Sequence, residues 1–217
     1  GVETLSANTD GIAVRYDGAL QSQVDDQVSQ FSDLSKFVFE FTPYRVLAMK
    51  DVNNYIAVKT DRSLKVKGIY SQLSLRKNPT AQVSSDAVGA WLSNGTEIGE
   101  TIYNSPFANF ISARNVTGGG KQEGKYLGKV VRWYQSTESI EPIRYFTNDN
   151  KVPKSDGARA CMTIEDFKTH PHDLDYNWYL KEAIKIVVAV GGVKYLTADQ
   201  LALVAPQPKR RKKNDGK

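Results

Sequence analysis

The sequence contains few of the residues that support several common chemistries. It has one cysteine, Cys161, and two histidines in 217 residues. A single cysteine cannot form an internal disulfide, so we expect a reducing, cytoplasmic compartment. Both histidines lie in residues 170–172, and with only these two no Ser, His and Asp set for nucleophilic catalysis can be argued. The pair also lacks a third ligand at a suitable spacing, so a metal site at these histidines is not favoured.

Long apolar runs and a net charge on the main part of the chain are also missing. The best apolar run, residues 184–190, is far shorter than the roughly 18 residues of a membrane helix, so no membrane partner is expected. The opening Gly1-Val2-Glu3 does not resemble a secretory signal. The formal charge of +5 lies entirely in residues 209–217, which hold six Lys or Arg and one Asp. A nucleic-acid surface elsewhere would therefore need local clustering of cations.

Apolar spacing predicts an antiparallel sheet with one packed helix in the first third of the chain. A helical spacing of three and four covers residues 19–36, through Leu20, Val24, Val28, Phe31 and Leu34. Residues 60–63 form a turn between two strands and so predict a hairpin. The strands are expected at residues 2–7, 12–16, 37–41, 44–49, 55–59 and 64–70.

The remainder is predicted to be mainly helical, so the fold class is α+β. One helix is expected to begin at Ser84 or Ser85 and to end at Asn94-Gly95. Others are expected at residues 96–106 and 176–190, the last capped by Asp173 or Asp175, and Thr197 can open a capping box for a final short helix. Residues 118–120 are expected to form a flexible glycine loop, residues 126–134 favour a strand, and residues 206–217 are predicted to be a disordered basic tail.

The turn "NTDG" places Asp10 between two of the predicted strands. Asn and Asp-Gly sequences are typical of tight hairpin turns, and on spacing alone this structural role is favoured. The functional alternative is that two stiff strands hold the Asp10 carboxylate out as a ligand for Mg²⁺, which binds carboxylate and phosphate oxygens. Both alternatives remain open at this point.

Basic residues mixed with aromatic ones indicate a second candidate site. The segment "GKVVRWYQS" contains Lys129 and Arg132, and the loop "VPKSDGAR" contains Lys154 and Arg159. Such clusters suit phosphate backbones, although a solvated surface with core aromatics is equally consistent with them. The segment "GGGKQEGK" lacks the Gly-Lys-Ser/Thr ending of a phosphate-binding loop and is not interpreted as one.

Four stretches, taken in order, resemble a family B DNA polymerase of the kind that bacteriophages encode. They are "SANTDG", "DVNNYIAVKTDRSLKVKGIY", "YLGKVVRWYQS" followed by "KVPKSDGARA", and "DLDYNWYLKEAIKIV". The first is similar to the palm motif Asp-Thr-Asp-Ser, the second to the later palm segment with Lys-x-Tyr, and the others to the thumb. The resemblance implies residues 1–75 as the C-terminal part of the palm and residues 76–205 as the thumb.

The resemblance assigns roles to individual residues. Asp10 corresponds to the principal metal ligand and would bind catalytic Mg²⁺. Tyr55, Lys67 and Gly68 would lie near the primer terminus, and Lys129, Arg132, Lys154 and Arg159 would contact the DNA backbone. The sequence departs from the family pattern at Asn8 and Gly11, and at Asn53, which stands where the family has the Lys of Lys-x-Tyr.

The implied function is a part of a template-directed DNA polymerase for phage genome replication. Its partners would be primer–template DNA, deoxynucleoside triphosphates and the N-terminal polymerase polypeptide that carries exonuclease, fingers and the other catalytic carboxylate. Two-metal phosphoryl transfer needs carboxylates that hold both ions, so the isolated chain is expected to be an inactive nucleotidyltransferase fragment. The alternatives are a non-enzymatic nucleic-acid-binding module and a structural protein with a coincidental hairpin.

Overall fold

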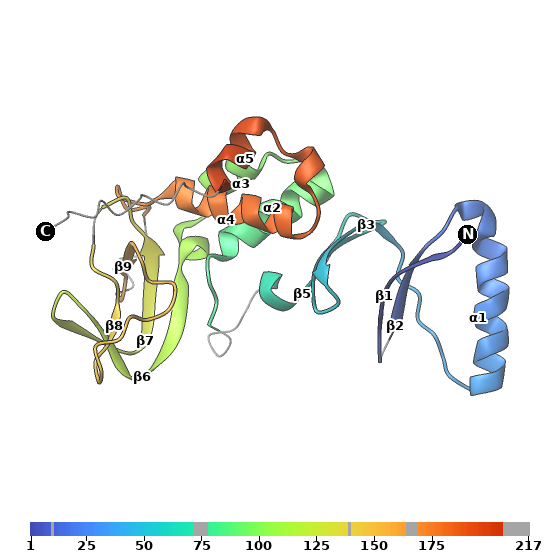
Figure 1. Cartoon of the computed structure of the whole chain (residues 1–217), viewed down its shortest axis with the longest axis horizontal. Coiled ribbons are helices and arrows are strands. Elements are labelled where there is room, and N and C mark those ends of the chain that lie inside the picture. The colour runs from blue at the N-terminus through green and yellow to red at the C-terminus, as the bar shows by residue number, and fades with distance from the viewer. Residues whose placement is uncertain (10, 72–77, 139, 164–168, 206–217) are drawn as a thin grey trace, which may run out of the picture.

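The computed structural model describes residues 1–9, 11–71, 78–138, 140–163 and 169–205. Its elements follow one another along an elongated molecule, with the N-terminal hairpin and helix at one end and a four-stranded sheet at the other (Figure 1). Antiparallel sheets alternate with helices along the chain. The predicted α+β class is confirmed.

The N-terminal hairpin forms where the turn sequence predicts it. Strand β1 (Glu3–Asn8) pairs antiparallel with β2 (Gly11–Arg15), and Asn8 lies opposite Gly11 at the closed end. The helix α1 (Gln21–Ser35) also forms as predicted, and Lys36, which follows it as the C-cap, has a left-handed φ of 62°. On its apolar side Val24 and Val28 are half-buried, whereas Phe31 and Leu34 are exposed.

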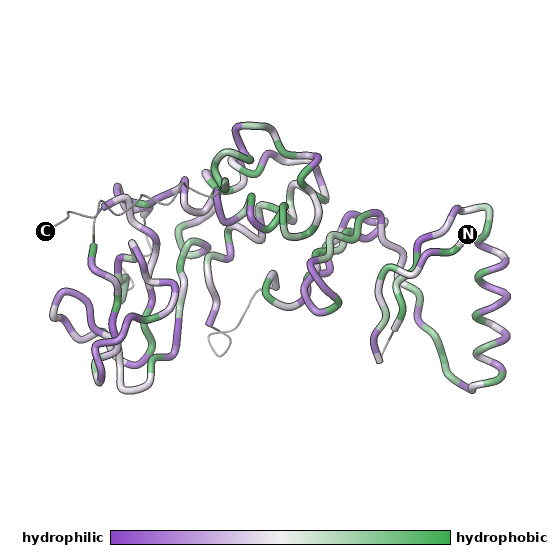
Figure 2. Tube along the Cα trace, in the orientation of Figure 1, coloured by the Kyte–Doolittle hydropathy of each residue, from purple (hydrophilic) through white to green (hydrophobic). Residues whose placement is uncertain are grey.

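Residues 37–41 do not form the predicted strand. Their aromatic and β-branched side chains favour extended structure. A strand also needs a paired neighbour for its backbone groups, and no described strand pairs with this segment. The segment is therefore an irregular connection that is hydrophobic except at Glu40 (Figure 2).

A three-stranded sheet, β3-β4-β5, connects the N-terminal section to the helices. Its strands are β3 (Tyr44–Asp51), β4 (Asn54–Lys59) and β5 (Leu64–Lys67), paired antiparallel as two consecutive hairpins. Directly opposed residues share a face, so Ile56 and Val66 lie on one side of this sheet. That side packs on the helix α2 (Gln82–Asn94), where Gly89 approaches so closely that a Cβ would lie 2.8 Å from Leu64 Cδ1.

The helices enclose the larger hydrophobic core. With α2, the helices α3 (Ile98–Asn104), α4 (Tyr176–Ala189) and α5 (Ala198–Val204) surround buried side chains from both halves of the chain. The Asn94-Gly95 stop, the Asp175 cap and the Thr197 capping box are confirmed. The cap predicted at Ser84 or Ser85 is wrong: α2 begins at Gln82, and Ser84 is buried and donates a hydrogen bond to the Tyr179 carbonyl.

A four-stranded sheet in the order β8-β6-β7-β9 lies at the far end of the molecule. The predicted strand near residues 126–134 is β7 (Lys125–Gln135), and it pairs with β6 (Ser112–Gln122). The short strands β8 (Arg144–Tyr145) and β9 (Ala158–Ala160) complete the sheet. A second core cluster, which includes Val131, Trp133 and Ile143, is associated with this sheet.

The expected glycine loop at residues 118–120 is part of strand β6, so that prediction is wrong. Gly118 and Gly119 have φ values of 77° and 93°, and the pairing with β7 is irregular around them. A Cβ on Gly119 would lie 2.3 Å from Tyr126 Cε2, and one on Gly120 would lie 2.7 Å from Val131 Cγ2. The glycines therefore permit a bulged strand with close side-chain contacts.

The predicted division at residue 75 falls outside the described residues, but the core on either side of it is continuous. Ile56 and Tyr70 before it belong to the same buried cluster as Val88 and Ile184 after it. Within the described residues, no helix is long and apolar enough to cross a membrane. The predicted basic tail, residues 206–217, also lies outside the described part.

Candidate nucleic-acid interface

The hairpin that carries Asp10 is present, while Asp10 itself lies outside the described residues. Asn8 and Gly11 close the ribbon on either side of the turn. At the open end, Glu3 accepts a hydrogen bond from Arg15 Nε at 3.0 Å. The role of the Asp10 carboxylate as a Mg²⁺ ligand therefore stays a prediction.

Tyr55 and Lys67 are brought together by the β4–β5 hairpin. They lie directly opposite each other, and the next pair on the same face is Ala57 and Lys65. This face is the one turned away from the helical core, since Ile56 and Val66 occupy the other. Sequence reasoning missed Lys65, although its spacing of two from Lys67 within a strand could have identified it.

Lys65, on β5, lies near Tyr44 of β3, across the central strand β4. Its Nζ is 6.0 Å from the centre of the Tyr44 ring. The Tyr44 hydroxyl, as a hydrogen-bond partner and by its charge interaction, raises the pKa of Lys65 above the ordinary lysine value. The ammonium group therefore stays charged over the whole physiological range. We call Tyr44, Tyr55, Lys65 and Lys67 the cationic strand face.

Gly68 directly follows strand β5 and has a geometry that only glycine fits. Its φ is 70°, and a Cβ would lie 2.2 Å from the Asn53 carbonyl oxygen and 2.2 Å from Asn54 Oδ1. The Asn54 side chain accepts a hydrogen bond from the Ile69 amide at 2.9 Å and donates to Asp51 at 2.8 Å. The hydrogen bond from the Asn53 amide, followed by that from the Asn54 side chain, lowers the pKa of Asp51. This network fixes the direction in which the chain leaves the cationic strand face.

The cations predicted on the thumb do not share one face of their sheet. Side chains alternate along a strand, so Lys129 and Arg132, three residues apart on β7, lie on opposite faces. Lys129 is exposed and Arg132 is half-buried. Lys154 is exposed in the loop before β9, at a left-handed φ of 66°, and its carbonyl accepts a hydrogen bond from Gln135.

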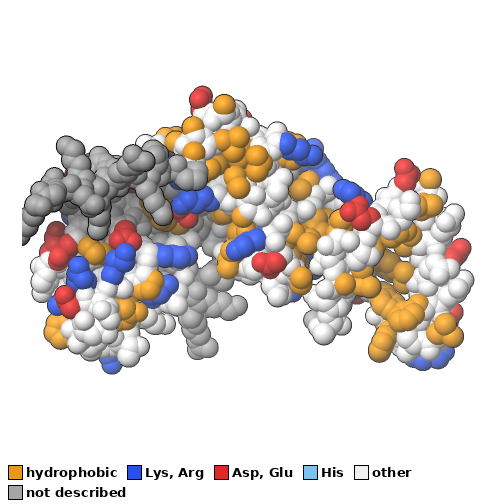
Figure 3. Space-filling view, in the orientation of Figure 1, with side chains coloured by type: hydrophobic (Ala, Val, Ile, Leu, Met, Phe, Trp, Pro, Cys, Tyr) orange, Lys and Arg blue, Asp and Glu red, His pale blue; other side chains and the backbone are white. Residues whose placement is uncertain are grey.

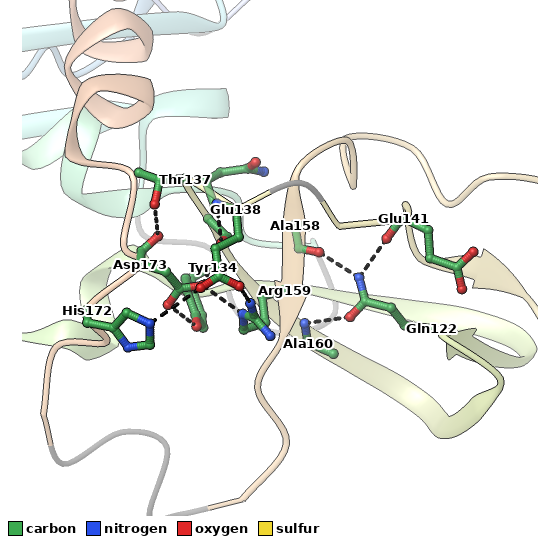
Figure 4. Close-up of polar contacts among 12 residues, drawn as sticks. Gln122, Tyr134, Thr137, Glu138, Glu141, Ala158, Arg159, Ala160, His172 and Asp173 are labelled. Carbon is green, nitrogen blue, oxygen red and sulfur yellow. Dashed lines mark hydrogen bonds and ion pairs between the residues drawn. The ribbon is translucent and has the colours of Figure 1, made fainter.

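Arg159 is held by carboxylates of this chain. Its Nε donates to Asp173 Oδ2 at 2.7 Å, and its Nη2 pairs with Glu138 (Figure 4). Asp173 also accepts hydrogen bonds from the hydroxyls of Tyr134, at 2.8 Å, and Ser136, at 2.5 Å. The Arg159 charge is thus largely compensated, which makes it the least suited of the four thumb cations to bind phosphate.

This network, the Asp173 cluster, links strand β7 to the start of α4. Burial alone would raise the pKa of Asp173, but the hydrogen bonds from Ser136, Arg159 and Tyr134 outweigh burial and lower it. Burial, with the hydrogen bond to Asp173, raises the pKa of Tyr134. The sequence alone contains no signal for this cluster, because its members are separated by up to 39 residues and meet only in the folded chain.

The two histidines have partners of other kinds. His170 Nδ1 lies 2.6 Å from the Tyr176 hydroxyl, and His172 Nε2 lies 3.4 Å from Glu138. No group of three or more His, Cys, Asp or Glu side chains in the described ranges is arranged to hold a metal ion.

Acidic and basic residues are distributed unevenly along the sequence. Residues 1–43 contain seven Asp or Glu and two Lys or Arg, a net charge of −5. Residues 44–208 contain 21 Lys or Arg and 16 Asp or Glu, a net charge of +5. A neutral sum over residues 1–208 thus conceals an acidic N-terminal section beside a basic remainder.

No protein-family model matches the chain, and a search of the curated proteins finds no match either.

Proposed function

We propose that this chain is the C-terminal palm and thumb part of a phage-type family B DNA polymerase. The proposal is supported by the resemblance of four ordered sequence stretches and by the hairpin at residues 3–15, whose turn contains Asp10. The cationic strand face adds physical support, because Lys65 and Lys67 are exposed beside two tyrosines and can neutralise backbone phosphates.

The residues have distinct roles in this proposal. Asp10 binds Mg²⁺, which would neutralise charge on the transferred phosphates. Tyr55, Lys67 and Gly68 support the primer end of the duplex, and Lys129, Arg132 and Lys154 contact its backbone. Arg159 supports the thumb through Asp173, and this role differs from the direct DNA contact expected from its sequence.

A single carboxylate is half of a two-metal site, so the chain needs a partner. The partner polypeptide supplies the second carboxylate, the fingers and the exonuclease. Nucleotide triphosphates and primer–template DNA bind the assembled enzyme. The isolated chain is inactive because one carboxylate at a ribbon turn cannot position both metal ions.

The test is reconstitution with the polypeptide encoded immediately upstream. The chain alone should not extend a primed template with Mg²⁺ and nucleotides, and the mixture should. Asp10→Ala should abolish extension by the mixture and leave the melting temperature of the chain unchanged, whereas Thr9→Ala at the same turn should retain extension. Extension by the chain alone would overturn the half-site argument, and a large loss of stability in Asp10→Ala would favour a turn-forming role.

A nucleic-acid-binding module without catalytic activity is the second candidate. The charge of +5 over residues 44–208, added to the basic tail, favours it independently of the hairpin. This candidate predicts salt-dependent DNA binding that Asp10→Ala does not change, and no extension with any partner. DNA binding that is absent or insensitive to salt would exclude both candidates.

A further inference from the structure

The N-terminal section leaves an unusual amount of apolar surface uncovered. More than half of the exposed large hydrophobic side chains of the described residues lie in residues 1–43, about a fifth of the chain. They gather over the hairpin, α1 and the segment after it (Figure 3). They are Val2, Leu5, Ile12, Val14, Phe31, Leu34, Phe37, Val38, Phe39 and Phe41. We call these ten side chains the N-terminal apolar surface.

The area of this surface is that of a protein interface. Leu34 is 85% exposed and Val38 is 95% exposed, while the other members are between 36% and 68% exposed. With roughly 150–200 Å² for each such side chain, the exposed area totals about 1,000 Å². Apolar patches on monomers usually reach roughly 300–600 Å², and a standard interface buries about 800 Å² on each partner.

The backbone of residues 38–41 is also unpaired. Phe37 is hydrogen-bonded to α1 at both of its backbone groups. Ser32 Oγ donates to the Phe37 carbonyl, and the Phe37 amide donates to Ser35 Oγ. Among the described residues, no hydrogen bond forms to the backbone of residues 38–41. A segment with strong strand preference and free backbone groups can receive a strand from another chain. The two-stranded hairpin beside it also has free edges and is marginally stable by itself.

Charge determines which kind of chain fits this surface. Residues 1–43 have a net charge of −5, and Asp25, Asp26 and Asp33 all lie on α1. A second copy that docks through the same surface, as in a two-fold dimer, would bring a second acidic rim against the first, which is unfavourable. A partner with Lys or Arg around an apolar contact is complementary in charge.

We propose that the N-terminal apolar surface binds a different polypeptide, which adds a β-strand to residues 38–41, covers the apolar side chains and has a basic rim. The proposal deepens the proposed function and rests on it in one respect, because the polymerase partner is the polypeptide expected to carry this complementary surface. Binding orders residues 38–41 as a strand and covers α1, so the N-terminal section gains its core from the partner.

The probe is a synthetic peptide that alternates valine with lysine, with a valine–glutamate peptide as its charge-reversed control. Hydrogen–deuterium exchange of the full chain should show protection of the amides of residues 38–41 by the lysine peptide. Its dissociation constant should be at least tenfold lower than that of the glutamate peptide at low salt, and the difference should shrink at high salt. Val38→Pro removes one of these amides and should abolish the protection. Ile69→Ser, at a side chain that is 57% exposed outside the surface, should not.

Several results would count against the proposed docking surface. Absence of protection, equal affinity for both peptides, or self-association of the chain in sedimentation equilibrium would overturn it, the last because a second copy then covers the surface. DNA synthesis by a reconstituted enzyme that is insensitive to Val38→Pro would refute the docking surface and leave the polymerase proposal intact. Protection by the lysine peptide in a chain that never supports synthesis would support the docking surface and refute the polymerase proposal.

Discussion

Asp173→Asn should destabilise the protein more than any other single charge removal among its described ion pairs. The Asp173 side chain is 3% exposed and its two oxygens accept from Tyr134, Ser136 and Arg159. Asparagine keeps one acceptor oxygen, and the Ser136 hydroxyl can rotate to accept from the new amide. Arg159 has only donors, so it keeps a hydrogen bond only if the amide oxygen turns toward it, and in either orientation of the amide it loses the negative charge of its buried partner.

The expected loss is about 2–3 kcal/mol of unfolding free energy, the range for a hydrogen bond to a charged group together with a partly unpaired partner. The Arg159 side chain is 35% exposed and keeps its pair with Glu138, which limits the penalty. Urea unfolding followed by tryptophan fluorescence measures the difference, because Trp133 is buried next to Tyr134 on β7. Asp156→Asn is the matched control, since the Asp156 side chain is 71% exposed and pairs only with Lys151 among the described residues.

The pH dependence provides a separate check. The pKa of Asp173 in the folded chain is lowered from the ordinary value of 3.8. Its contribution to stability is therefore complete above about pH 4 and is lost as the pH falls through the folded pKa. The difference between the original chain and Asp173→Asn should be constant at neutral pH and should shrink in acid. A loss no larger than that of Asp156→Asn, or a difference that grows as the pH falls, would refute the reasoning.

Two further predictions concern the cationic strand face and Gly68, the residue that follows it. Gly68→Ala should lower the melting temperature more than Gly95→Ala, because both positions have positive φ but only Gly68 has a backbone oxygen where the Cβ would lie; equal losses in thermal denaturation would contradict this. Lys65→Ala and Lys67→Ala should each reduce the slope of log affinity against log salt for duplex DNA by about 1 in fluorescence anisotropy. Lys185→Ala on α4, where Lys185 already pairs with Glu182, should leave the slope unchanged.

Local patterns in the sequence were sufficient for elements whose determinants are close together. The Asn and Asp-Gly turn predicted the β1–β2 hairpin, and the turn at residues 60–63 set the register that places Lys67 opposite Tyr55. The periodicity of residues 176–190 and the following Gly191-Gly192 predicted α4 to within a residue. In each case the signal and the structure it specifies lie within about 20 residues.

Features that depend on distant partners were not predictable in the same way. Residues 37–41 have the composition of a strand, but a strand also requires a paired neighbour, and none of the described strands pairs with them. Gly118 and Gly119 suggested a loop, yet they form a bulged strand because Tyr126 and Thr147 pack where side chains would otherwise lie. The charge compensation of Arg159 by Asp173 likewise depends on a contact that only the tertiary fold creates.

The continuity of the core across residue 75 has a practical consequence for anyone who divides this protein for expression. A piece that starts at residue 76 would lose the apolar cover that Ile56 and Tyr70 provide for the helices, and would be prone to aggregate. A cut near residue 43 would instead remove the acidic N-terminal section and spare the buried interior. The smallest stable recombinant fragment is therefore expected to begin just before Tyr44, at β3.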